Sequence, residues 1–106
     1  MEREMEKVAV IHTAFEDKPS TVAFVDVPED STLIDKLEYA YRWTQNIMDS
    51  WSLKMPEDGN DAVTVVGDVS DGYGLRSTSV GDQMLVGNVK YKVARFGFET
   101  LDGEAV

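Results

Sequence analysis

The sequence predicts a small α+β domain in which a mainly antiparallel sheet packs on one amphipathic helix. Short segments rich in β-branched and aromatic residues lie on both sides of a single stretch with helical spacing. Polar segments with turn-forming residues connect them. A chain of 106 residues has room for one hydrophobic core, so residues 1–106 are expected to form a single domain.

Two strands are expected before the helix. Residues 8–15 (VAVIHTAF) and residues 21–27 (TVAFVDV) are rich in β-branched residues, which favour strands. The loop between them is short and polar and contains Pro19, which favours an antiparallel pair. Pro28 should end the second strand, because proline has no N–H to donate to a neighbouring strand.

The helix is expected to begin just after residues 30–32. Asp30, Ser31 and Thr32 all suit an N-cap, and Asp35 stands three residues after Thr32 in the spacing of a capping box. Apolar residues then recur at three- and four-residue steps, which predicts an amphipathic helix of roughly five turns that closes near Asp49. The apolar stripe comprises Leu33, Leu37, Ala40, Tyr41, Thr44, Ile47 and Met48.

The second half of the chain is expected to consist of short strands and loops. Residues 54–61 form a polar linker, and Gly87-Asn88 suits the two-residue turn of a β-hairpin. Residues 96–101 give a last extended piece, and residues 102–106 a frayed tail. The strand candidates are residues 62–66, 84–86 and 89–93. The predicted order of elements is therefore β-β-α-β-β-β.

The composition excludes several classes of partner. Twenty acidic and ten basic residues give a net charge of −10, which repels phosphate backbones and anionic membrane surfaces. Solubility, adaptation to salt and imitation of nucleic acid all remain open as reasons for this acidity. No apolar run approaches the roughly 20 residues that cross a bilayer, and the N-terminal stretch lacks the apolar region of a signal peptide. The absence of cysteine fits a reducing compartment, so a cytosolic protein is expected.

The sequence offers few groups for catalysis. His12 is the only histidine and falls inside an expected strand, whereas hydrolytic triads need an imidazole beside a nucleophile and zinc sites need several ligands. The acidic loops around Asp58 and Asp71 do not match the spacing of calcium loops. The glycines do not form a phosphate-binding pattern. The sequence therefore leans against an enzyme and predicts no catalytic residue, metal site or cofactor.

Two groups of polar and aromatic residues are candidates for binding. Arg76 stands beside three hydroxyl side chains that could help it hold a phosphate or carboxylate, or Arg76 could pair with Asp82 while the hydroxyls cap a turn. Two tryptophans flank Asn46 and could anchor an interface or close the edge of the core. The candidate binding residues are Trp43, Asn46, Trp51, Arg76, Ser77 and Ser79.

Two stretches carry a resemblance to known proteins. The first is LEYAYRWTQN at residues 37–46 with Ser50-Trp51, and the second is LRSTSVGD at residues 75–82, continuing to FGFE at residues 96–99. Together they resemble a group of short proteins of tailed bacteriophages that have no established activity. The second stretch is also similar to the end of the YodL-like domain of mobile-element proteins. The resemblance spans roughly residues 33–101.

The resemblance implies an accessory protein of a phage or mobile element that acts in the cytoplasm of a bacterial host. It carries over no catalytic role. Together with the charge and the lack of catalytic motifs, it favours a non-enzymatic protein that binds a host or phage protein. Two alternatives stay open: a binding module or enzyme that uses residues 76–82 on a phosphate- or carboxylate-bearing small molecule, and an acidic nucleic-acid mimic. The oligomeric state is not predicted.

Overall fold

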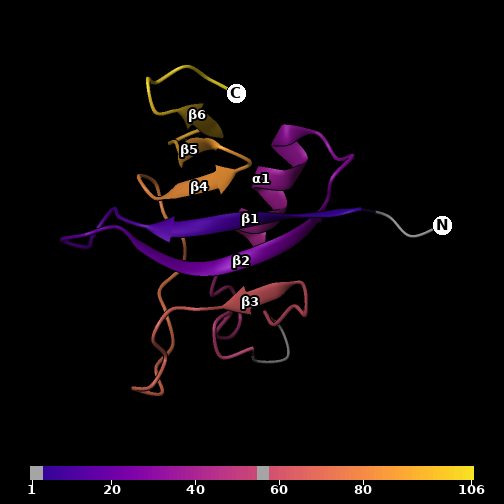
Figure 1. Cartoon of the computed structure of the whole chain (residues 1–106). Helices are drawn as coiled ribbons and strands as arrows, with labels where there is room; N and C mark the ends of the chain where they lie inside the picture. Colours follow the sequence, from indigo (N-terminus) through magenta and orange to yellow (C-terminus); the bar gives the residue numbers. More distant parts are fainter. Residues whose placement is uncertain (1–3, 55–57) are drawn as a thin grey trace.

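The computed structural model describes residues 4–54 and 58–106, which form one antiparallel sheet with a helix on one face (Figure 1). The strands lie in the order β3-β2-β1-β4-β5-β6. Their bounds are Met5–His12 for β1, Ser20–Pro28 for β2, Val63–Val65 for β3, Gln83–Val86 for β4, Val89–Val93 for β5 and Phe98–Thr100 for β6. The predicted α+β class is confirmed, but the predicted order of elements lacked β6.

The N-terminal hairpin occupies the middle of the sheet. In Figure 1, β1 runs beside β2 on one side and β4 on the other, and both pairs are antiparallel. Val8 faces Val25 and Val10 faces Ala23, so these side chains share the face that the helix covers. From Val8 to His12, every residue of β1 is buried. The continuous apolar run in the sequence thus corresponds to the central strand.

Helix α1, Leu33–Arg42, begins directly after Thr32, which is one of the three predicted N-cap candidates. The Thr32 hydroxyl accepts a hydrogen bond from the Asp35 amide at 3.1 Å, which identifies Thr32 as the N-cap. The helix ends at Arg42, much earlier than the pattern of apolar residues suggested. Ile47 and Met48 consequently lie beyond it and are 59% and 74% exposed, instead of completing the apolar stripe.

Hydrogen bonds to distant residues explain the early end of the helix. The Asn46 amide donates to the Ser77 hydroxyl at 2.8 Å. The amides of Met48 and Asp49 both donate to the carboxylate of Asp58 at 2.6 Å. Amides that continued the helix would donate to carbonyls four residues back, so these contacts replace the helical pattern. Asp58 was expected in an exposed polar linker, but the structure buries it. Residues 55–57 of that linker lie outside the residues that the structure describes.

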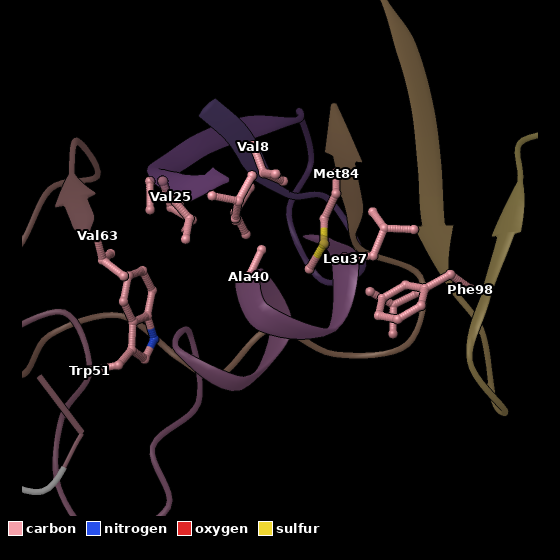
Figure 2. Packing of buried hydrophobic residues seen from close by; sticks show 13 residues of the cluster. Val8, Val25, Leu37, Ala40, Trp51, Val63, Met84 and Phe98 are labelled. Atoms are coloured by element: carbon pink, nitrogen blue, oxygen red, sulfur yellow. The ribbon is translucent and has the colours of Figure 1, made fainter. Parts of the chain in front are cut away.

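The hydrophobic core lies between the helix and the sheet. Figure 2 shows Leu37 and Ala40 of α1 among side chains of the strands, with Trp51 and Phe98 at opposite ends of the cluster. Trp51 packs beside Val63 although it belongs to the loop after the helix. It is 1% exposed, so it is a core residue and not an exposed anchor.

The C-terminal residues fold back along the edge strand β6. The Thr100 amide donates to the Glu104 carbonyl at 2.9 Å, and the Val106 amide donates to the Phe98 carbonyl at 3.0 Å. Ala105 bridges to Glu99. The prediction of a frayed tail is therefore wrong, because this segment pairs with backbone groups that an edge strand would otherwise leave open.

Candidate functional site

The two sequence stretches with candidate binding residues lie against each other. The Thr78 amide donates to the Thr44 carbonyl at 3.0 Å. The side-chain amide of Asn46 donates to the Leu75 carbonyl at 3.0 Å, and the Trp51 indole donates to the Arg76 carbonyl at 3.0 Å. The segment after α1 thus holds the backbone that carries Arg76.

The guanidinium of Arg76 bridges two carboxylates. Nη1 and Nη2 donate to Asp82 at 2.6 and 2.8 Å, and Nε and Nη2 donate to Glu16 at 3.1 and 2.8 Å. Nη1 also donates to the Ser77 carbonyl at 2.9 Å. A guanidinium has five N–H groups, and these five contacts use all of them. The expected pair of Arg76 and Asp82 is confirmed, with Glu16 as an additional partner.

Asp82 is the buried centre of this network. Its side chain is inaccessible to solvent and also accepts hydrogen bonds from the amides of Thr13 at 2.8 Å, Ala14 at 2.9 Å and Ser79 at 2.8 Å. Burial by itself raises the pKa of Asp82, but the hydrogen bonds from Arg76 and the three amides outweigh it and hold that pKa at about 2. Asp82 is therefore an anion that fastens the residues after β1 to the segment before β4.

Gly81 lets these two segments approach each other. Its φ is +98°, a backbone conformation that side chains disfavour. A Cβ at this position would also lie 3.2 Å from the Cβ of Ala14. Both observations explain why a glycine occupies this position.

His12 belongs to a buried chain of hydroxyls. Its Nε2 lies 3.0 Å from the Thr78 hydroxyl, which donates to the Thr44 hydroxyl at 2.8 Å. The nearest oxygen of Asp82 is 4.0 Å from Nε2. Burial lowers the pKa of His12, although the Asp82 carboxylate acts in the opposite direction.

Asp82, His12 and Thr78 are the residue types of a hydrolytic triad, but the Thr78 hydroxyl is not accessible to a substrate. His12 is 2% exposed and Thr78 is 1% exposed, so a substrate has no path to the hydroxyl. An active triad also needs hydrogen bonds along its whole length, and 4.0 Å is too long for one between Asp82 and His12. These three residues therefore form a structural network.

The remaining candidates divide into two places. The Ser77 hydroxyl accepts from Asn46, and the Ser79 hydroxyl donates to the Ser77 carbonyl at 3.2 Å, so both serines belong to the network around Arg76. Trp43 stands apart at the end of α1, where the Arg42 guanidinium lies 4.1 Å from its ring centroid. Five of the six candidate residues thus gather in one region, and Trp43 does not.

A pocket lies on another part of the surface, between α1 and the turn that joins β5 to β6. Its volume is about 310 Å³. The lining residues are Glu38, Tyr41, Val80, Val93, Ala94, Arg95, Gly97 and Phe98. Sequence reasoning did not identify this site, although Val80, Gly97 and Phe98 belong to the stretch that carries the family resemblance.

The described part of the chain shows no group of three or more His, Asp or Glu residues that could hold a metal ion. Within residues 4–54 and 58–106, no helix has the length and apolar character needed to cross a bilayer. No protein-family model, curated protein or solved structure matches this chain.

Proposed function

We propose that this chain is a non-enzymatic binder of a host or phage protein, encoded by a phage or mobile element and active in the bacterial cytoplasm. The observation that carries the proposal is the tip of the β5–β6 hairpin. Phe96 is 89% exposed there, and its neighbour Arg95 is exposed without a hydrogen bond or ion pair to any described residue. Phenylalanine and arginine are among the residue types that are enriched in protein interfaces relative to the rest of the surface.

Binding of a small ligand at Arg76 has less support. All five of its N–H groups have partners, and its side chain is 27% exposed. A phosphate or carboxylate would have to displace Glu16 or the buried Asp82. Losing Asp82 would leave a buried charge without its partner, which costs several kcal/mol.

Mimicry of nucleic acid also has less support. Mimicry requires rows of uncompensated carboxylates, whereas several acids here pair with bases. Lys7 lies 2.8 Å from Asp26, and Lys92 lies 3.5 Å from Glu99. These pairs interrupt the negative charge on one face of the sheet.

Quantitative affinity capture from lysates of infected bacteria tests the proposal with the variants Phe96→Ser and Tyr73→Ser. Tyr73 is a matched control, because it is 87% exposed and lies in a loop on another part of the chain. The proposal expects a captured protein that wild type and Tyr73→Ser retain and Phe96→Ser loses at least tenfold. Thermal unfolding should show that all three proteins are folded.

Two results would contradict the proposal. One is the absence of any captured protein that depends on Phe96. The other is a captured DNA-binding enzyme that duplex DNA releases in a salt-sensitive manner and that Phe96→Ser retains, which would favour the mimic.

A further inference from the structure

The pocket between α1 and the β5–β6 turn has an apolar floor. Val93 and Phe98 are 4% and 8% exposed, so the strands hold them in place. The Tyr41 ring of α1 meets the Phe98 ring nearly edge-on, with centroids 6.2 Å apart and an interplanar angle of 82°. At about 310 Å³, the pocket lies at the lower end of the range for small-molecule sites. This floor therefore suits one apolar or aromatic side chain.

Two opposite charges line the walls of the pocket. Glu38 lies on the helix wall and Arg95 on the hairpin wall. Both are exposed, and neither makes an ion pair within 4.0 Å with any described residue, including the other. The Tyr41 hydroxyl likewise has no hydrogen-bond partner in the described part of the chain. By contrast, every N–H group of the Arg76 guanidinium already donates to an acceptor in the protein.

The charges restrict which ligand can bind. A net charge of −10 disfavours the approach of an anion, and Arg95 disfavours a cation inside the pocket. A neutral molecule with one positive and one negative group avoids both penalties and can satisfy both walls. Charge-assisted hydrogen bonds from a guanidinium to a carboxylate and from an ammonium to a carboxylate are strong.

We propose that this pocket binds a free apolar α-amino acid in its zwitterionic form. The ligand carboxylate faces Arg95, its ammonium group faces Glu38, and its side chain rests on the floor formed by Tyr41 and Phe98. Arg95 takes part in both proposals, but Phe96 does not line the pocket, so a variant of Phe96 separates amino-acid binding from the proposed protein binding. A Phe96→Ser variant that has lost its protein partner should still bind the amino acid.

Titration of the ¹⁵N-labelled protein with L-phenylalanine, followed by NMR, tests this inference. Saturable shifts are expected at the amides of Val80, Ala94 and Gly97. N-acetyl-L-phenylalanine lacks the ammonium group and L-phenylalanine methyl ester lacks the carboxylate, so each should bind about tenfold or more weakly, which is about 1.4 kcal/mol. All three ligands are titrated into wild-type protein at pH 7.

Two variants test which protein residue contacts which charged group of the ligand. Arg95→Gln should weaken L-phenylalanine binding about tenfold and abolish the preference over the methyl ester, while Glu38→Gln should abolish the preference over the N-acetyl form. Lys90→Gln and Glu29→Gln are matched controls at exposed positions outside the pocket and should bind like wild type. Because all four positions are exposed, the variants are expected to keep the unfolding midpoint of wild type.

Three outcomes would overturn the inference. The first is the absence of saturable shifts at ligand concentrations up to about 10 mM. The second is equal binding of the zwitterion and the two blocked forms. The third is comparable binding of N-acetyl-L-phenylalanine amide, which has neither charge and would show that the pocket accepts an apolar side chain of a polypeptide.

Discussion

Replacing Asp82 by asparagine tests whether its buried charge organises the fold. The substitution keeps the size of the side chain but removes the anion that Arg76 and three backbone amides contact. An asparagine also turns one acceptor oxygen into a donor, which would face other donors. Both changes leave buried polar groups without partners.

The expected loss is about 3 kcal/mol in the free energy of unfolding. Breaking a buried ion pair by removing one partner costs about 3–5 kcal/mol, and the lower end applies because Arg76 keeps Glu16. The pKa of Asp82 gives a second estimate of what this carboxylate contributes to stability. A shift from 3.8 to about 2 corresponds to about 2 kcal/mol that ionisation of Asp82 contributes to the folded state.

Urea unfolding followed by tryptophan fluorescence, to which buried Trp51 and half-buried Trp43 both contribute, measures the loss. Glu16→Gln is the matched control, because it removes the other, partly exposed partner of Arg76 and should cost less than about 1 kcal/mol. The folded-state pKa of Asp82 is depressed, so its contribution is present above pH 3.8 and declines as the pH falls towards about 2. The Asn variant should lack this decline. A loss of no more than about 1 kcal/mol for Asp82→Asn would refute the reasoning.

Three further predictions concern single positions. Gly81→Ala should cost about 2 kcal/mol in unfolding free energy, and more than Gly72→Ala, because both glycines have positive φ but only Gly81 has a neighbour within 4 Å of an added Cβ. Equal losses would exclude a role for that contact. Because the pKa of His12 is lowered in the folded state, stability should fall as the pH drops below 6.5, and His12→Gln should flatten this decline in urea titrations at several pH values. Thr32→Ala should lower the unfolding free energy by about 1 kcal/mol, and an unchanged value would contradict the N-cap.

Features that depend on neighbouring residues were predictable from the sequence. The Thr32 cap needs only the amide of Asp35 three residues later. The hairpin of β4 and β5 needs only a two-residue turn, and Gly87 has the positive φ of +60° that such a turn requires. The α+β class followed from the spacing of apolar residues. In the cap and the hairpin, the groups that decide the structure lie within a few residues of each other.

The candidate site was predictable only in part. The pair of Arg76 and Asp82 spans six residues and could be proposed from turn chemistry. Glu16 is 60 residues from Arg76, and as one of twenty acids it carries no sign of that contact in the sequence. The pocket likewise combines Glu38 and Tyr41 of the helix with Arg95 of a distant turn. Neither the contact between Arg76 and Glu16 nor the pocket exists before the sheet brings these segments together.

The end of the helix shows why tertiary structure decided the rest. The sequence continues its apolar pattern through Ile47 and Met48, and an isolated helix would follow that pattern. In the fold, the Ser77 hydroxyl and the Asp58 carboxylate accept the amides of Asn46, Met48 and Asp49, so the helical hydrogen bonds are not made. Helix propensity differs by less than about 1 kcal/mol per residue, whereas a hydrogen bond to a charged group contributes about 1.5–3 kcal/mol. The sequence by itself determined the α+β class and the region in which the helix starts. Contacts between distant segments determined where the helix ends, the burial of Trp51 and the composition of both sites.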